Sequence, residues 1–231
     1  MKRHIPHVFT MMNLFSGCIA VVMAFEGNFS GVVIWVLIAA VCDFSDGFVA
    51  RLFDATSPLG KELDSLADVV SFGVAPASAV FILLRDFSAY PSFLTDFSSY
   101  LPFLAYLIPV FSALRLGKFN LDDKQTSSFL GLPTPANALF WISYCYGFRY
   151  IASVNEVLFY LTLGFIIVLS LLLVSNIPMF SFKIKTFKFK GNEKQILLVI
   201  LLIIFIALWG IIGIAIGILA YIAISLIANM L

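Results

Sequence analysis

Long apolar stretches follow one another along the chain, separated by short polar segments. A helix needs about 20 apolar residues to cross the hydrocarbon core of a bilayer. Eight stretches predict such helices, and they lie at residues 8–25, 31–50, 63–84, 98–116, 134–150, 157–177, 196–210 and 213–230. Each stretch is continuous, whereas a transmembrane barrel would show short segments of alternating hydrophobicity. The pattern therefore predicts an all-α fold, a polytopic transmembrane helical bundle.

The C-terminal stretch from Ile196 to Leu231 contains no charged residue. As a single helix it would be about 54 Å long at 1.5 Å per residue, which is too long for one crossing. Gly210 and Gly213 offer a turn, so we expect two helices there. The predicted organisation is a membrane core at 1–180, a basic cytoplasmic loop at 181–195 and two additional C-terminal transmembrane helices at 196–231.

The composition excludes several classes of protein. Hydrophobic residues make up 61% of the 231 residues and charged residues only 12%, whereas a soluble domain usually carries about 25% charge. A chain with so little charge is not expected to be a soluble enzyme, a disordered chain or a nucleic-acid binder. The cysteines Cys18, Cys42 and Cys145 match no disulfide or metal-binding pattern, so we expect them to be small buried apolar residues.

Basic residues are distributed unevenly between the predicted loops. With the N-terminus in the cytoplasm, every Lys and Arg except Arg85 and Arg149 falls on the cytoplasmic side. The segment Lys183–Lys190, which reads KIKTFKFK, is then expected to anchor the topology beside anionic headgroups. We therefore expect an integral protein of the inner (cell) membrane with both termini in the cytoplasm.

Acidic side chains are concentrated between the second and third predicted helices. Ionisable groups at membrane depth are costly, and they indicate function. Asp43 and Asp46 are three residues apart and share one helix face, and Asp64 and Asp68 are four apart and share another. If the two helices are antiparallel neighbours, the four carboxylates converge.

A turn is expected between these acidic faces, at Ser57, Pro58 and Gly60. Four converging carboxylates would repel one another unless cations or protons intervened, and hard divalent cations prefer oxygen ligands. Two such ions can clamp a phosphoryl group for in-line displacement. The small residues Gly47 and Ala50 are expected to open a shallow groove for a bulky ligand.

The window 43–68 resembles the signature of the CDP-alcohol phosphatidyltransferase family, and all eight residues fixed in that signature are present. They are Asp43, Asp46, Gly47, Ala50, Arg51, Gly60, Asp64 and Asp68. Four segments are similar to the phosphatidylserine synthase subfamily, at 5–17, 64–77, 111–120 and 129–138. Lys118 departs from the subfamily pattern, because arginine is expected there, and lysine lacks the bidentate geometry of arginine.

The resemblance implies a fold and a reaction. The fold is a six-helix transmembrane core, to which the last two predicted helices are an addition. The reaction is the divalent-metal-dependent transfer of a phosphatidyl group from CDP-diacylglycerol to L-serine, which gives phosphatidylserine and CMP. A homodimer in the lipid bilayer is also implied, and the active site is expected on the cytoplasmic side.

The resemblance also assigns roles to residues. It implies that two ions of Mg²⁺ or Mn²⁺ are held by Asp43, Asp46, Asp64 and Asp68, and that Asp68 is also the catalytic general base. It implies that CDP-diacylglycerol is bound by Thr10, Asn13, Asp43, Asp46, Gly47, Ala50, Arg51 and Gly60. Helix–helix hydrogen bonds are an equally good interpretation of Thr10 and Asn13.

Serine is a zwitterion, and its carboxylate needs a cationic partner. Arg115, Lys118 and Asn120 lie together at the cytoplasmic end of the fourth predicted helix. We expect Arg115 and Lys118 to bind the acceptor carboxylate, with Asn120 assisting. A positive-inside anchor would place the same charges there, so the sequence leaves both interpretations open.

The prolines predict local helix geometry, and the histidines predict a location near the headgroups. Pro76 is expected to kink the third helix, and Pro133 and Pro135 are expected to set the start of the fifth. His4 and His7 are expected near the headgroups, without an acidic partner.

Other functions stay open on the sequence alone. Glycerol phosphate, inositol, inositol phosphate or choline as the acceptor would use the same signature. A membrane prenyltransferase also uses Asp-rich metal motifs, but its motifs usually lie on well-separated helices. A distant alternative is a cation-coupled transporter, which would place charges near the midplane and often shows inverted repeats, and this chain shows neither.

Overall fold

The computed structural model describes residues 5–53, 57–87, 96–121, 129–151, 156–180 and 192–230. Its elements are α1 (Ile5–Phe25), α2 (Phe29–Leu52), α3 (Pro58–Asp68), the π-helix η2 (Val69–Val74), α4 (Ala75–Arg85), the 3₁₀-helix η4 (Leu101–Tyr106), α5 (Leu107–Leu121), β1 (Phe129–Leu130), α6 (Thr134–Phe148), α7 (Glu156–Leu173), β2 (Pro178–Met179), α8 (Glu193–Trp209) and α9 (Ile212–Met230). The basic segment Lys183–Lys190 and His4 lie outside the described residues.

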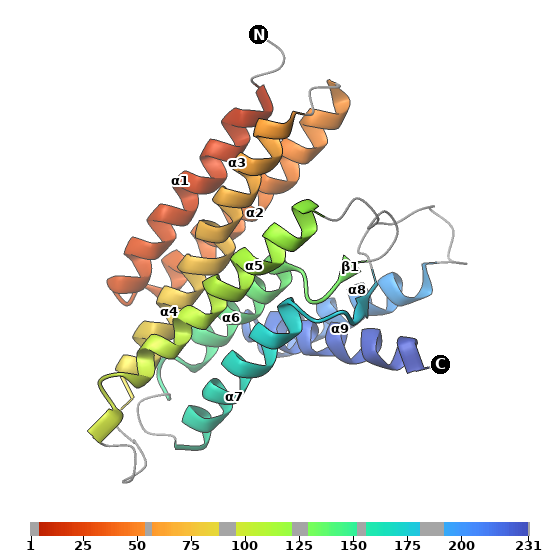
Figure 1. Cartoon of the computed structure of the whole chain (residues 1–231). Helices are drawn as coiled ribbons and strands as arrows, with labels where there is room; N and C mark the ends of the chain where they lie inside the picture. Colours follow the sequence, from red (N-terminus) through yellow and green to blue (C-terminus); the bar gives the residue numbers. More distant parts are fainter. Residues whose placement is uncertain are drawn as a thin grey trace.

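The fold is an all-α polytopic bundle, as the hydrophobic pattern predicts (Figure 1). Each of the eight predicted stretches corresponds to a helix or to a run of consecutive helices. Among the described residues, five helical runs are long and apolar enough to cross a membrane, and the apolar parts of α8 and α9 are shorter. The chain is therefore an integral membrane protein.

The first two helices form an antiparallel hairpin. Gly27 adopts the left-handed conformation that glycine tolerates, with φ of 70°. Asn28 then caps α2, since its side chain accepts a hydrogen bond from the Gly31 N–H at 2.9 Å. The tight turn keeps α1 and α2 in contact along their length, so residues near the start of α1 lie beside the end of α2.

The run from α3 through η2 to α4 is the central element of the bundle. Nearly every side chain of α4 is buried, and α4 contacts α1, α2, η4 and α6. The π-helix η2 precedes Pro76, and the Ala75 N–H bonds to the Val70 carbonyl five residues back. Proline lacks an N–H and its ring collides with the carbonyl four residues back, so the wider π turn accommodates Pro76. This π turn directly follows Asp68, and the predicted kink at Pro76 stays a prediction.

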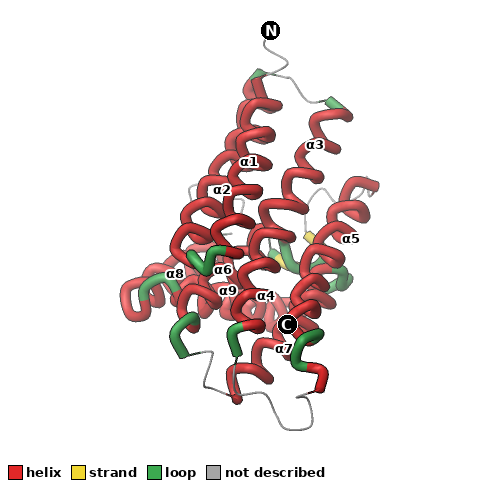
Figure 2. The backbone as a smooth tube through the Cα atoms, turned by 90° about the vertical axis from the view of Figure 1, so that its left-hand side faces the viewer, coloured by secondary structure: helices red, strands yellow, loops and turns green. Residues whose placement is uncertain are grey.

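The C-terminal helices form a second antiparallel pair. Gly210 has φ of 64° and ends α8, so the predicted division of this stretch into two helices is confirmed. α8 and α9 run across the direction of α1–α5 in both views, and α9 packs against α6 (Figure 1, Figure 2). The division of the chain into a core, a loop and an addition stays a prediction.

A two-residue antiparallel pairing joins β1 to β2, with Phe129 opposite Met179 and Leu130 opposite Pro178. This pairing ties the segment before α6 to the segment after α7. Pro133 is the N-cap of α6 and Pro135 lies in its first turn, so the prediction for this helix start is confirmed.

The cysteines are free thiols, and Cys42 and Cys145 are buried as predicted. The prediction is wrong for Cys18, which is exposed. An exposed apolar position on a membrane helix faces lipid rather than water. Hydrophobicity alone therefore does not distinguish a position that faces lipid from one buried inside the protein.

Candidate active site

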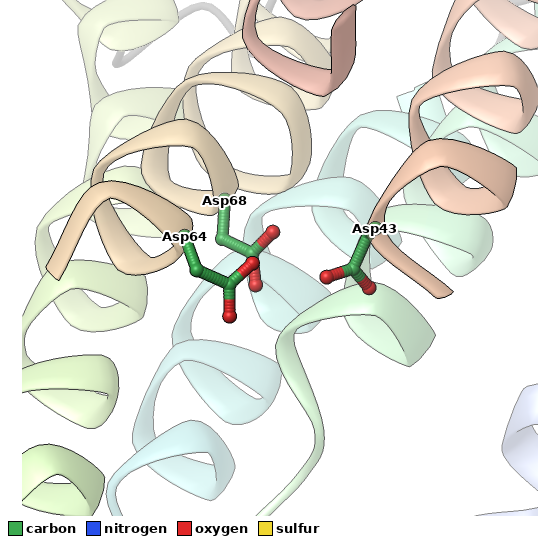
Figure 3. A group of neighbouring side chains, drawn as sticks. All are labelled: Asp43, Asp64 and Asp68. Atoms are coloured by element: carbon green, nitrogen blue, oxygen red, sulfur yellow. The ribbon is translucent and has the colours of Figure 1, made fainter. Parts of the chain in front are cut away.

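Three of the signature acids come together between α2 and α3. Asp43 projects from α2, and Asp64 and Asp68 project from consecutive turns of α3 (Figure 3). One carboxylate oxygen from each lies within 4.8 Å of the others. The predicted convergence is therefore present for three of the four acids. The turn predicted at Ser57, Pro58 and Gly60 needs a correction. Ser57 is the N-cap of α3, and Gly60 already lies inside that helix, where its N–H donates to Ser57 Oγ.

Asp46 lies beside this group and has a separate contact. Its Oδ2 accepts a hydrogen bond of 2.8 Å from the Thr10 hydroxyl of α1. It interacts electrostatically with Asp43, Asp64 and Asp68. The structure thus brings three acids to one point and holds the fourth next to it.

The chemistry of this group fits a divalent cation. Asp64 Oδ1 is buried and has no hydrogen-bond partner among the described residues. None of the three clustered acids forms an ion pair with a Lys or Arg in the described ranges. Like charges held this close in a buried place need a counter-charge, and carboxylate oxygens are the ligands that hard divalent ions prefer. The residues present could therefore hold such an ion.

The α1 helix positions Asp68. Asn13 is fully buried, and its Nδ2 donates to Asp68 Oδ1 at 3.1 Å. The Ser71 hydroxyl in η2 lies 3.0 Å from the Asn13 backbone oxygen and donates to it. Gly17 permits this close approach, since a Cβ there would stand 2.8 Å from the Ser71 Cα. Asn13 thus forms the helix–helix hydrogen bond that was one of its two predicted interpretations.

A pocket of about 580 Å³ opens beside the acids, between the start of α1, the end of α2 and the start of α3. Its lining residues are Pro6, His7, Thr10, Asp46, Gly47, Ala50, Ser57, Pro58, Gly60, Lys61 and Asp64. Five residues predicted for the nucleotide-lipid, including the small residues Gly47, Ala50 and Gly60, are among them. Space beside Gly47 is open, because the nearest atom to a Cβ there would be Arg51 Nη1 at 3.8 Å.

The remaining predicted residues of this site lie outside the pocket lining. Arg51 is exposed at the end of α2, and Asn13 is buried behind Asp68. Asp43 and Asp68 form the inner group with Asp64, which is the acid that both lines the pocket and belongs to the cluster.

His7 and Lys61 are lining residues that the sequence analysis did not assign to the site. His7 interacts electrostatically with Asp46, so the expectation that it has no acidic partner is wrong. The α1–α2 hairpin brings the start of α1 to the end of α2, and a Cβ at Gly60 would lie 3.2 Å from His7 Cε1. The available signal was that His7 precedes Thr10 by three residues and so shares its helix face.

The three residues predicted for the acceptor have different surroundings. Arg115 is buried in α5, and its Nη1 donates to Thr134 Oγ1 at 2.9 Å. Asn120 Nδ2 donates to Ser65 Oγ at 2.9 Å, which links α5 to α3. Lys118 is exposed. The predicted cluster is therefore divided between the interior, a helix contact and the surface.

Comparisons with known proteins agree with this geometry. The family model described as CDP-alcohol phosphatidyltransferase matches residues 3–228. A CDP-diacylglycerol–serine O-phosphatidyltransferase of Helicobacter pylori is 34% identical over 203 residues, which cover 85% of this chain and 78% of the relative. A protein of the same name from Bacillus subtilis is 33% identical, over 58% of this chain and 70% of its own length.

A third relative is the archaetidylserine synthase of Methanothermobacter thermautotrophicus, which is 34% identical over 58% of this chain and 54% of the relative. The signature residues, the acid group that they form and the match over nearly the whole chain lead to one assignment. This chain belongs to the CDP-alcohol phosphatidyltransferase family.

Proposed function

We propose that this protein transfers a phosphatidyl group from CDP-diacylglycerol to L-serine, with phosphatidylserine and CMP as products. The observation that carries the proposal is the group of Asp43, Asp64 and Asp68 at the family's signature positions, with Asp64 at the wall of a pocket. Serine is favoured as the acceptor because the relatives described above are named as serine-transferring enzymes or as an archaetidylserine synthase.

The pocket is the proposed site of the CDP part of the donor, and the acyl chains stay in the bilayer. Thr10, Asp46, Gly47, Ala50 and Gly60 line it, and the absence of large side chains at the last three leaves room for a nucleotide diphosphate. Arg51 Nη1 would lie 3.8 Å from a Cβ at Gly47, which lines the pocket, so its guanidinium is proposed to reach a phosphate of the donor. Asn13 contributes through Asp68 rather than by direct contact.

Asp43, Asp46, Asp64 and Asp68 are the proposed ligands of Mg²⁺ or Mn²⁺, as two ions. When bound, such ions neutralise charge on the diphosphate oxygens and assist departure of CMP. The protein's own contribution is to hold the carboxylates in place, through Thr10 on Asp46 and Asn13 on Asp68.

Asp68 is the proposed general base. It accepts the proton of the serine hydroxyl as that oxygen attacks the phosphatidyl phosphorus, and the bond from phosphorus to the CMP oxygen breaks. A single displacement inverts the configuration at phosphorus. A chiral phosphorothioate donor tests this step, and retention of configuration would exclude direct attack.

Two further proposals concern the protein in its membrane. The excess of Lys and Arg on one side favours cytoplasmic termini and a cytoplasmic active site, which reporter fusions at each end would test. The family resemblance favours a homodimer, which the mass of the detergent-solubilised protein measured by light scattering would test.

The main experiment combines purified protein with CDP-diacylglycerol, a series of metal ions and one acceptor at a time. We expect phosphatidylserine by mass spectrometry with L-serine and Mg²⁺ or Mn²⁺, and no product after chelation. Glycerol phosphate, inositol and inositol phosphate are the comparison acceptors. A lipid product from one of these, with none from serine, would assign a different acceptor.

A further inference from the structure

A second polar group lies inside the bundle, where α5 meets the start of α6. Arg115 is 9% exposed, and its Nε is buried without a hydrogen-bond partner among the described residues. Asn137 is 0% exposed, and within the same ranges neither its Nδ2 nor its Oδ1 has a partner. Thr134 connects the two, because it accepts from Arg115 Nη1 and shares a helix face with Asn137, three residues further on.

Unpaired polar atoms in a protein interior call for an explanation. More than nine in ten buried polar groups in native proteins have a hydrogen-bond partner, and the exceptions mark bound water, ions or functional sites. Here the unpaired atoms comprise a guanidinium N–H, an amide donor and an amide carbonyl. A ligand that pairs all of them must carry both an acceptor and a donor, and the charge of the guanidinium favours an anionic acceptor.

The chain holds this group in place by specific contacts. Gly131 has φ of 73°, and its N–H donates to the Ile177 carbonyl at 2.9 Å. The Leu132 N–H donates to the Leu172 carbonyl at 3.0 Å. The start of α6 is therefore tied to the end of α7, and α7 in turn contacts α5, so Thr134 and Asn137 are held in place beside α5.

The group is separate from the pocket and adjacent to the acids. Neither Arg115 nor Asn137 lines the pocket. Arg115 interacts electrostatically with Asp68, the proposed general base, and with Tyr221 of α9. A small acceptor held by Arg115 would therefore have its hydroxyl near the acid that takes up its proton.

We propose that Arg115, Thr134 and Asn137 form the subsite for the charged end of an amino-acid acceptor, and that Asn137 is a specificity-determining residue. The carboxylate of the acceptor pairs with Arg115 Nε and the Asn137 amide N–H, and its ammonium group donates to Asn137 Oδ1. The inference rests on the proposed function and deepens it, because it explains selection of a zwitterion over a neutral alcohol.

The subsite is closed in this structure, since Asn137 is fully buried. Occupancy therefore requires a local separation of α5 from α6, and an acceptor that binds only the open form shifts the population toward it. Serine has few heavy atoms, so the opening needed is small.

The test measures the KM for serine and for CDP-diacylglycerol in Asn137→Leu and in wild type. A hydrogen bond to a charged group is worth enough that its loss should raise the serine KM about 10- to 100-fold. The KM for CDP-diacylglycerol should change less than about twofold, because a residue outside the donor pocket contributes no donor binding. Tyr144→Phe is the matched control on the same helix, and it should leave both values unchanged.

Acceptor analogues identify the contact. Ethanolamine lacks the carboxylate, and 3-hydroxypropionate lacks the ammonium group. In wild type, the inhibition constant of each analogue should therefore be far higher than the KM for serine. In Asn137→Leu, the inhibition constant of 3-hydroxypropionate should lie closer to the KM for serine than it does in wild type. If Asn137→Leu does not fold, Asn137→Ser is measured instead, with the same expected direction.

The outcomes separate this inference from the proposed function. An unchanged serine KM in a folded Asn137 variant would overturn the inference, whatever the thermal midpoint of that variant. Absence of phosphatidylserine synthesis by wild type would instead overturn the proposed function.

Discussion

The bundle contains two polar groups that differ in charge, access and origin. The acid group of Asp43, Asp64 and Asp68 is anionic, lies beside an open pocket and comes from helices adjacent in sequence. The group of Arg115, Thr134 and Asn137 is cationic and amide-bearing, is closed to solvent and joins α5 to α6. The difference teaches that each group lacks a different partner. Within the described part of the chain, the acids lack a basic partner, whereas the second group lacks an acceptor and a donor together.

The two groups also differ in their support. Hydrogen bonds from α1 hold two of the signature acids, because Thr10 donates to Asp46 and Asn13 donates to Asp68. The Arg115 group is held from α7 through backbone bonds at Gly131 and Leu132. Because the supports are separate, a substitution in one support should leave the hydrogen bonds that hold the other group unchanged.

The largest effect is expected from Asp68→Asn. It removes the proposed general base, so kcat should fall about 10²- to 10⁴-fold. The folded state should be as stable as wild type or more so, because one of several like charges is lost. The measurement is turnover at saturating substrates, together with the thermal midpoint in detergent. Activity within tenfold of wild type would exclude Asp68 as the base.

A smaller effect is expected from Asn13→Ala, which leaves Asp68 in place but removes the hydrogen bond that orients it. A hydrogen bond to a charged group contributes about 1.5–3 kcal/mol, so kcat/KM should fall about 10- to 100-fold. Its effect should be absent in the Asp68→Asn background, because the two residues act together. Additive losses in the double variant would show that Asn13 acts independently of Asp68.

Gly17→Ala tests the α1 support through packing. A Cβ at Gly17 would stand 2.8 Å from the backbone Cα of Ser71, and such overpacking costs about 1–3 kcal/mol. The thermal midpoint should fall, and CDP-diacylglycerol turnover should fall with it. Gly164→Ala on α7 is the matched control, since no atom lies within 4 Å of a Cβ there. Equal midpoints for the two variants would contradict the close-contact argument.

The smallest effect is expected from Lys118→Gln. Lys118 is exposed on α5, whereas Arg115 is buried, and surface charges contribute little to binding. The serine KM should rise less than about threefold, against a much larger rise for Arg115→Lys, which loses the planar fork of donors. Similar rises of the serine KM in both variants would indicate that Lys118 and Arg115 contribute equally to acceptor binding.

Sequence spacing predicted the acid group well but predicted the acceptor group only in part. Asp64 and Asp68 share one face of α3 because they are four residues apart, and Asp43 lies in the C-terminal half of α2, the helix that precedes α3 in the sequence. Arg115 was predicted together with Lys118 and Asn120, its neighbours in sequence. Its contact in the structure is Thr134, on the next helix, and no periodicity within α5 indicates that partner.

The amino-acid sequence by itself determined the membrane class, the helices, the break at Gly210 and the pairing of acids along each helix face. These are local properties, set by the length of apolar runs, by glycine and by helical spacing. Only the tertiary structure decided that His7 lines the pocket and that Asp46 accepts from Thr10. It also decided that Arg115 contacts Thr134, and that Asn137, one turn further along α6, is buried without a partner among the described residues. Those outcomes depend on how each helix is rotated against its neighbours, and that rotation is fixed by long-range contacts such as Gly17 on Ser71.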